Sequence, residues 1–159
     1  HSFEVDTSGW FSYGGSAILR VPGGQDGAFS LRMTGPNSTA IFGVADSNNW
    51  VTNVPAIGTR YRLTAWVMSP TSRGSARIRV REYLSGVQQG QTVQSTSVTL
   101  SPTWQMLTVD YVSAAAGSKL NMQIRDTPVV AGEVFQTDNI SIIIVDSAAP
   151  AAPFGLNVN

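Results

Sequence analysis

Three arginines and a tyrosine alternate along one short stretch of the chain. Residues 76–83 read Ala-Arg-Ile-Arg-Val-Arg-Glu-Tyr, so a β-strand would turn Ile78 and Val80 to one face and the arginines to the other. The second face would carry Arg77, Arg79, Arg81 and Tyr83. Guanidinium groups bind hydroxyls and carboxylates through planar, forked hydrogen bonds, and a tyrosine ring offers a flat surface to a sugar. The pattern indicates either a glycan-binding face or a solvated face partly paired with Glu82 or Asp110.

Three acidic residues stand near the two ends of the chain and could share a ligand. Glu4 lies in a short first strand, Asp26 in a glycine-rich turn, and Asp138 at the head of the last strand. First and last strands of a sandwich usually lie close together, so the three carboxylates could converge. Hard oxygen ligands favour calcium over zinc or copper. The spacing indicates a calcium site or, alternatively, three carboxylates that each cap a turn.

Nucleophilic catalysis has few candidate residues in this chain. His1 is the one histidine and there is no cysteine, so a serine nucleophile has no plausible base and no disulfide can form. Paired carboxylates could in principle hydrolyse a glycoside, but no acids stand in a recognisable pairing. We therefore expect a domain that is not an enzyme, with a small glycan-active enzyme as the outside alternative.

The elements that must position these residues read as strands throughout. Short alternating stretches recur at about ten-residue spacing between glycine- and proline-rich turns, and no helical period persists. The strongest are Arg60–Met68 and residues 119–125, the latter with Asn121, Gln123 and Arg125 on one side. This pattern predicts one all-β domain, an antiparallel β-sandwich.

Composition limits the partners. Acidic and basic residues number 10 each, so no general electrostatic case exists for nucleic acid or a membrane surface. No stretch is long enough to span a bilayer. Few residues are charged and serine, threonine, glycine, asparagine and glutamine abound, which is typical of secreted, extracellular β domains. Residues 147–159 read as a proline/alanine linker that runs into the start of a fibronectin type III-like module. We expect a domain of residues 1–146, a monomeric module within a longer multidomain chain.

Six short motifs in order resemble the carbohydrate-binding modules of families 4, 9, 16 and 22. They are Phe3-Glu4, Gly9-Trp10, Asp26-Gly27-Ala28-Phe29-Ser30-Leu31, Gly58-Thr59-Arg60-Tyr61-Arg62-Leu63-Thr64-Ala65-Trp66-Val67, Thr103-Trp104 and Thr137-Asp138-Asn139-Ile140. The resemblance covers about residues 2–146. It implies a galactose-binding-like jelly roll that binds polysaccharide in a concave sheet and performs no catalysis.

The resemblance also implies a structural calcium ion that joins the first strand to the last. Glu4 and Asp138 match the family's side-chain ligands and Asp26 a third. The backbone carbonyls of Ser2 and Phe29 match the remaining protein ligands. Such an ion would hold the termini together and take no part in chemistry.

The family's glycan site points to further residues on the expected cleft. Gln123 matches a position that hydrogen-bonds sugar hydroxyls, Arg125 lies two residues further on, and Trp50 is placed like an aromatic at the rim. Trp66 either floors the cleft or lies beneath a loop, whereas Trp10 and Trp104 match framework positions. The glycan-contact residues expected are Trp50, Trp66, Arg77, Arg79, Arg81, Tyr83, Gln123 and Arg125.

The density of arginine departs from the family's neutral-glycan binders, which favour asparagine, glutamine and aromatic residues on this face. It points to an acidic glycan such as alginate or pectin. Neutral glucan or xylan binding is the alternative, and so is a structural or adhesion domain whose arginines pack on a neighbouring domain. If the domain binds a polysaccharide, it would bring an attached glycoside hydrolase or polysaccharide lyase of a bacterium to its substrate.

Overall fold

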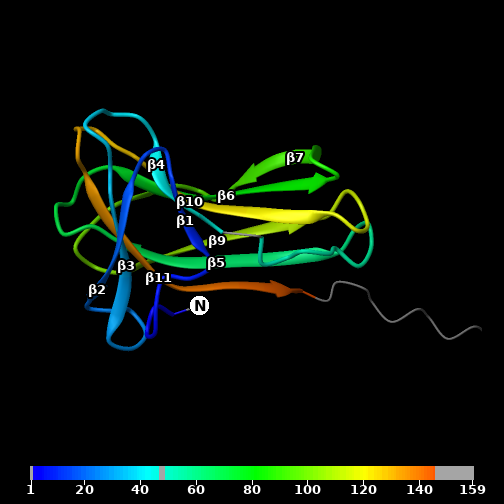
Figure 1. Ribbon diagram of the computed structural model, residues 1–159, viewed down its shortest axis with the longest axis horizontal. Coiled ribbons are helices and arrows are strands. Elements are labelled where there is room, and N and C mark those ends of the chain that lie inside the picture. The colour runs from blue at the N-terminus through cyan, green and yellow to red at the C-terminus, as the bar shows by residue number, and fades with distance from the viewer. Residues whose placement is uncertain (1, 47–48, 146–159) are drawn as a thin grey trace, which may run out of the picture.

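The computed structural model describes residues 2–46 and 49–145, which form eleven β-strands (Figure 1). The expected linker, residues 147–159, lies outside the described residues. The strands are β1 (Trp10–Tyr13), β2 (Ala17–Pro22), β3 (Phe29–Thr34), β4 (Phe42–Asp46), β5 (Arg60–Met68), β6 (Ser75–Leu84), β7 (Val87–Gln94), β8 (Val98–Thr99), β9 (Gln105–Val112), β10 (Lys119–Thr127) and β11 (Val134–Ile144). No helix among the described residues is long and apolar enough to cross a membrane.

The strands form two antiparallel sheets that pack face to face. Sheet A has the order β1-β4-β10-β6-β7, with β8 also paired to β6, and sheet B has the order β2-β3-β11-β5-β9. In Figure 1, β6, β7 and β10 run above β5 and β11. Each sheet contains a hairpin of consecutive strands, β6–β7 in sheet A and β2–β3 in sheet B. Early strands also pair with late ones, since β4 pairs with β10 and β3 with β11. The predicted all-β sandwich of the jelly-roll type is confirmed.

Alternation along the strands builds the core between the sheets. Ile78 and Val80 of β6 and Met122 and Ile124 of β10 are fully buried, as is Leu63 of β5 in the facing sheet. Successive side chains of a strand point to opposite faces, so burying these residues turns their neighbours outward. The arginines of β6 are therefore forced onto the outer face of sheet A by the apolar residues between them.

One irregularity shapes the last strand. Phe135 and Ile140 both lie in the core, which strict alternation would forbid because one position is odd and the other even. The register of β11 against β5 shifts between Asp138 and Ser141, and Asn139 has a φ of 44°. This β-bulge restores the alternation and leaves Asp138 opposite Trp66, on the outer side of sheet B.

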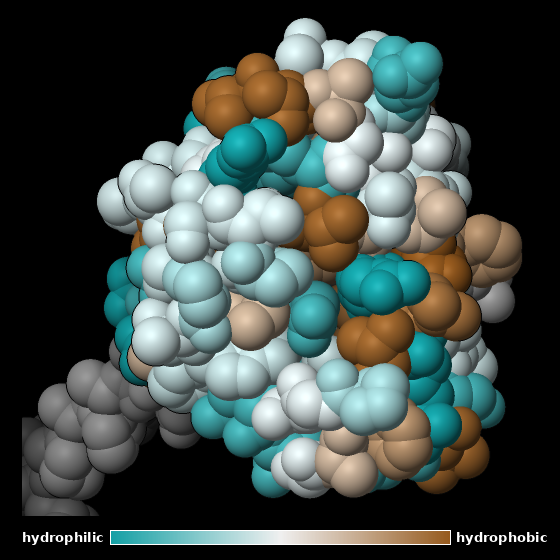
Figure 2. Space-filling view, turned by 90° about the vertical axis from the view of Figure 1, so that its left-hand side faces the viewer, coloured by the Kyte–Doolittle hydropathy of each residue, from teal (hydrophilic) through white to brown (hydrophobic). Residues whose placement is uncertain are grey.

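The surface carries no broad apolar face on the side shown in Figure 2. Hydrophobic residues there form small groups separated by polar ones. Scattered exposed apolar residues are usual for folded proteins and do not by themselves mark a partner surface.

Candidate functional site

The antiparallel register of β6 and β10 gathers most of the predicted glycan-contact residues on one surface. Arg77 stands opposite Arg125, Arg79 opposite Gln123, and Arg81 opposite Asn121. We call this surface the arginine face: Arg77, Arg79, Arg81 and Tyr83 of β6 with Asn121, Gln123 and Arg125 of β10. The sequence pattern of each strand alone could not show that the two strands are neighbours.

The arginines of this face hydrogen-bond to neutral side-chain amides. Arg79 donates to the side-chain oxygen of Gln123, Arg81 Nη2 to Asn121 Oδ1 at 3.4 Å, and Arg125 Nη2 to Gln94 Oε1 at 2.7 Å. The buried Nε atoms of Arg79, Arg81 and Arg125 have no hydrogen-bond partner. Amides satisfy donors without neutralising charge, so the face keeps an excess of positive charge.

The acids expected as partners for these arginines lie elsewhere. Asp110 forms an ion pair with Arg62 at 2.8 Å on sheet B, the one ion pair among the residues that the structure describes. Glu82 is fully buried and points into the molecule, away from the arginines of its own strand. The alternative in which Glu82 or Asp110 pairs with the arginine face is therefore wrong.

Buried Glu82 serves the fold instead. Its carboxylate accepts hydrogen bonds from Tyr111 Oη at 2.8 Å, from the amide nitrogens of Ala114 and Ala115 at 2.7 and 2.9 Å, and from the Ser118 hydroxyl. Burial alone would raise the pKa of Glu82, but these donors outweigh it and hold the pKa below the usual value. The carboxylate thus anchors the turn between β9 and β10.

Asp46 is a buried acid that contacts Asn121 of the arginine face. It is buried at the end of β4 and accepts from Met122 N at 2.9 Å and from Asn121 Nδ2 at 3.0 Å. Asn121 belongs to the arginine face and accepts from Arg81, so Asp46 contacts this face directly but its arginines only through Asn121. Burial raises the pKa of Asp46 to about 6.

Tyr13 of the edge strand β1 joins the arginine face, and the sequence reasoning missed it. The Arg79 guanidinium carbon lies 5.3 Å from the centre of the Tyr13 ring, and Arg125 lies near enough to the phenol to influence its pKa. Burial would raise the pKa of this phenol, but Arg125 and Arg79 outweigh it and lower the pKa. Tyr13 reaches them across Gly43, its partner on β4, which has no side chain to intervene. A side chain at Gly43 would overlap the backbone of Ile124.

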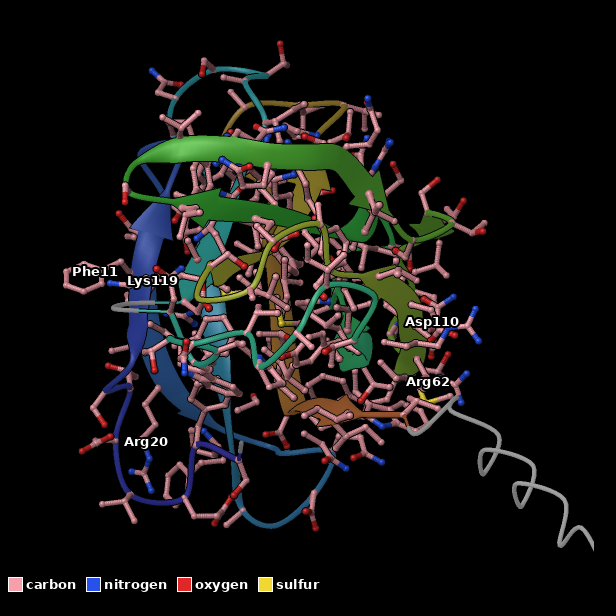
Figure 3. The ribbon with its side chains drawn as sticks, turned by 90° about the vertical axis from the view of Figure 1, so that its right-hand side faces the viewer. Phe11, Arg20, Arg62, Asp110 and Lys119 are labelled. Carbon is pink, nitrogen blue, oxygen red and sulfur yellow. The ribbon has the colours of Figure 1, made fainter. Side chains whose placement is uncertain are left out.

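Phe11 was also missed, although it alternates with buried Trp10 in the same short strand. It pairs with Ala45, which in turn pairs with Gln123, and 63% of its surface is exposed. Phe11 and Lys119 project toward the same side of the molecule (Figure 3). An exposed aromatic ring at the edge of a polar face is a typical sugar-stacking surface.

A hollow of about 700 Å³ opens at one end of the arginine face. Arg81, Tyr83, Lys119, Asn121 and Gln123 line it, and none of the described residues that line it is acidic. The Arg81 guanidinium carbon lies 5.5 Å from the centre of the Tyr83 ring. Amides and cations can hydrogen-bond to a sugar, and a flat ring can stack on it.

Two predicted contact residues are not on this face. Trp66 lies on β5 in sheet B, so it does not floor a cleft on sheet A. The Trp50 ring packs edge-on against Trp10 with centres 4.8 Å apart, and it borders a separate hollow of about 410 Å³ together with Tyr61 and Ile142. Strand phase alone could not tell which sheet Trp66 belongs to, nor which way the chain turns at Trp50.

The predicted metal ligands Glu4 and Asp138 converge on the loop before β3. Glu4 Oε1 accepts from Phe29 N at 2.9 Å, and Asp138 Oδ2 accepts from the backbone nitrogens of Gln25 and Asp26 at 2.8 and 3.0 Å. Hydrogen bonds from Phe29 and Ala28 lower the pKa of Glu4. The carboxylates tie this loop to the first segment and to the last strand.

These residues fit an oxygen-ligand cation in part. Asp138 is fully buried, and its Oδ1 has no hydrogen-bond partner, as expected for a ligand atom. The Asp26 residue is exposed, and no three acidic or histidine side chains gather as a metal-binding group within residues 2–46 and 49–145. Glu4 and Asp138 thus hold the same loop, and Asp26 does not complete a cluster of three acids with them among the described residues.

Known proteins of the same architecture bind sugars. One crystal structure contains the CBM22-1 and GH10 modules of Clostridium thermocellum endo-1,4-β-D-xylanase 10B with xylohexaose; the TM-score is 0.73 at 17% identity, over 95% of this chain and 29% of that one. The CBM22-1 xylan-binding domain of Paenibacillus barcinonensis Xyn10C gives a TM-score of 0.73 at 22% identity, over 93% and 94% of the two chains. TmCBM61, solved with β-1,4-galactotriose, gives a TM-score of 0.63 at 15% identity, over 91% and 94%.

At these identities the likeness shows the fold alone, and the chain spans under a third of the xylanase structure. No curated protein sequence matches the chain. A family model described as carbohydrate binding domain (CBM_4_9) matches residues 1–128, which confirms the resemblance inferred from the motifs and supports a non-catalytic role. The chain belongs to this family of carbohydrate-binding domains.

Proposed function

We propose that the arginine face binds a polysaccharide chain that carries carboxylates, such as alginate or pectin. The observation that supports this is the excess of positive charge. Arg79, Arg81 and Arg125 hydrogen-bond to the neutral amides of Gln123, Asn121 and Gln94, and the acids of sheet A face inward. Guanidinium groups bind carboxylates through short, charge-assisted bonds.

Neutral xylan is the second candidate ligand. The xylan-binding modules described above share the fold of this chain over nearly its whole length. Gln123, Asn121 and the Tyr83 ring offer the hydrogen bonds and the stacking surface that a neutral sugar needs. Xylan would bind to the same face, and the positive charge of that face would add little to its affinity because xylan is neutral.

The wider role that we propose is targeting. The domain would act outside a bacterial cell as an ancillary module of a glycoside hydrolase or polysaccharide lyase, and would raise the concentration of that enzyme on its substrate. We propose that the module binds as a monomer and takes neither nucleic acid nor a membrane as a partner.

Binding titrations at two salt concentrations test the choice of ligand. Alginate and polygalacturonate would be compared with xylan and a β-glucan, using the wild type, Arg79→Ala, Arg81→Ala and the control Arg62→Ala from sheet B. We expect tight binding to an acidic chain that weakens as salt rises, because exposed charges are screened beyond about 8–10 Å. Tight, salt-independent binding to xylan would reject the acidic ligand and keep the binding face. Absence of binding to every glycan would favour a structural or adhesion role.

We also propose that calcium binds beside the loop held by Glu4 and Asp138. When bound, the ion would supply a positive charge that links the first segment to the last strand. The unpartnered Oδ1 of buried Asp138 supports this ligand role, and Ser2 and Phe29 carbonyls and Asp26 are the further ligands implied by the family resemblance.

Thermal melting with calcium and with a chelator tests this site. A metal that binds only the folded chain stabilises it by mass action, so calcium should raise the Tm of the wild type. Asp138→Asn should abolish this rise in Tm. Asp6→Asn, which changes an exposed acid two residues after Glu4, should keep it. If neither calcium nor a chelator shifts the wild-type Tm, the proposed site does not exist.

A further inference from the structure

Two carboxyl groups meet in the interior, on the opposite side of sheet A from the arginine face. Asp126 belongs to the end of β10 and Glu133 immediately precedes β11, and the two residues are 0% and 4% exposed. Neither forms an ion pair with an arginine or lysine of the described residues. Two buried, unpaired carboxylates side by side would be costly if both were charged.

Each carboxyl group has one oxygen bound by the backbone and one oxygen left over. Asp126 Oδ1 accepts from Ser75 N at 2.9 Å, and Glu133 Oε1 accepts from the backbone nitrogens of Val129 and Val130, both at 3.0 Å. The other two oxygens, Asp126 Oδ2 and Glu133 Oε2, are buried and accept no hydrogen bond from another residue. Gly74 packs against both carboxyl groups, so the two side chains are close neighbours.

The leftover oxygens converge over Gly74. A Cβ at Gly74 would lie 2.6 Å from Glu133 Oε2 and 2.8 Å from Asp126 Oδ2, and the residue has a φ of 76° that favours glycine. The turn therefore packs directly on the two acids. Calcium takes six to eight oxygen ligands, and two carboxylates closed off by a backbone do not provide them. A hydrogen ion fits this site better than a metal ion.

No neighbouring charge replaces that hydrogen ion. Arg73, in the turn beside Gly74, is exposed, while Arg77 and Arg125 point to the opposite face of sheet A. Residues 35–40 and 128–132, which adjoin Glu133 through backbone hydrogen bonds or sequence, contain no ionisable side chain. Burial, with a further contribution from Glu133, raises the pKa of Asp126 to about 7.

We propose that Asp126 and Glu133 share one proton in a carboxyl–carboxylate hydrogen bond between Oδ2 and Oε2. This acid pair fastens the turn at residues 69–74, the end of β10 and the loop at residues 128–133 to one another. Release of the proton leaves two facing charges and weakens these contacts. The domain is then more stable in mildly acidic than in mildly alkaline solution.

The sign follows from proton binding in the two states. The unfolded chain releases the proton near pH 4, whereas the folded chain keeps it to a higher pH. The free energy of unfolding contributed by the pair is greatest below the unfolded pKa, falls as pH rises through the folded pKa, and changes little above that. Buried Asp46 titrates in the same direction but with a pKa of about 6, so it must be controlled for.

Amide substitutions replace the proton with a permanent donor. In Asp126→Asn, Oδ1 can still accept from Ser75 N while the amide nitrogen donates to Glu133 Oε2. In Glu133→Gln, Oε1 can still accept from Val129 and Val130 while the amide nitrogen donates to Asp126 Oδ2. Either variant should keep the geometry and lose the titration.

The test combines thermal melting between pH 5 and pH 8 with carboxyl ¹³C NMR titration of the whole domain, both with a chelator and with calcium. We expect the wild-type Tm to fall by about 5 °C across this range. Asp126→Asn and Glu133→Gln should each remove the part of that fall above pH 6, while the control Asp46→Asn should remove only the part near pH 6 that comes from Asp46 itself. The NMR titration should show that one carboxyl of the pair keeps its proton past pH 6.

Two results would overturn the proposal. One is ionisation of both carboxyls already at pH 5 in the wild type, which NMR reports even if a variant fails to fold. The other is an unchanged pH dependence of Tm in both amide variants. Stabilisation by calcium that disappears in Asp126→Asn but persists in Asp138→Asn would instead assign the pair to a metal ion.

Discussion

The guanidinium of Arg79 donates a hydrogen bond to the side-chain oxygen of Gln123, its direct partner across the β6–β10 ladder. A neutral amide thus occupies the position where a carboxylate would cancel the charge. The pair keeps the arginine in place and leaves its charge available to a ligand. A substitution at Gln123 can therefore test whether the face binds an acidic ligand.

Gln123→Glu should abolish binding of an acidic glycan without harming the fold. The new carboxylate would pair with Arg79, as in a partly buried ion pair, and would repel the carboxylates of the ligand. We expect at least a tenfold loss of affinity, or about 1.4 kcal/mol, by calorimetry, with an unchanged or higher Tm. The matched control is Gln136→Glu on sheet B, which should leave affinity alone. Undiminished binding of alginate or polygalacturonate to Gln123→Glu would contradict the role of this charge.

Phe11→Ala should weaken glycan binding and leave stability nearly unchanged. The ring is 63% exposed, so its removal exposes little core, but it stands at the edge of the arginine face next to Ala45. Stacking on an aromatic side chain contributes about 1–3 kcal/mol in comparable sites, and we expect a loss of about 1 kcal/mol, or roughly fivefold in affinity. Leu19→Ala, which removes a 53% exposed apolar side chain on sheet B, is the control. Equal affinities for wild type and Phe11→Ala would remove Phe11 from the site.

The sequence predicted the fold and the composition of the arginine face, because both follow from alternation. Burial of Ile78 and Val80 forces Arg77, Arg79 and Arg81 outward whatever the partner strand is. Alternation does not report which strands pair, so it could not place Trp66 on sheet B or bring Tyr13 over Gly43 to Arg125. Those facts depend on long-range register.

The sequence pattern also could not predict which residues the charged side chains bind. Asp110 is opposite Arg62 only because β9 pairs with β5, and Glu82 is buried only because the turn after β9 supplies its donors. The bulge at Asn139 changes the phase of β11 and thereby the side on which its residues lie. A single-strand pattern carries no information about such contacts.

Trp50→Ala should lower stability more than it lowers affinity. The ring packs edge-on against Trp10 at 4.8 Å, and Trp50 lies beside the core and away from the arginine face. Removing a partly buried aromatic side chain should cost about 2–3 kcal/mol, less than a fully buried one. Chemical denaturation would measure this cost, and titration of the folded variant would measure binding. A variant of normal stability with at least tenfold weaker binding would restore Trp50 to the glycan site.

Glu82→Ala should be among the most damaging single substitutions. It leaves the backbone nitrogens of Ala114 and Ala115 and the Tyr111 hydroxyl without their acceptor in the interior. Unsatisfied buried donors cost about 1–3 kcal/mol each, so a loss of roughly 3 kcal/mol or more in the free energy of unfolding is expected. Glu82→Gln keeps one acceptor oxygen and should lose less.

The Glu82 carboxylate should also make the free energy of unfolding decrease at acidic pH. Because the pKa of Glu82 is below its usual value in the folded chain, its contribution is present above the unfolded pKa and is lost as pH falls through the folded pKa. Urea denaturation between pH 2 and pH 6 should show wild-type stability decreasing toward acid, with a shallower decrease in Glu82→Gln. Asp110→Asn, whose exposed pair with Arg62 adds little, is the control. A decrease toward acid as steep in Glu82→Gln as in the wild type would show that other carboxylates cause it.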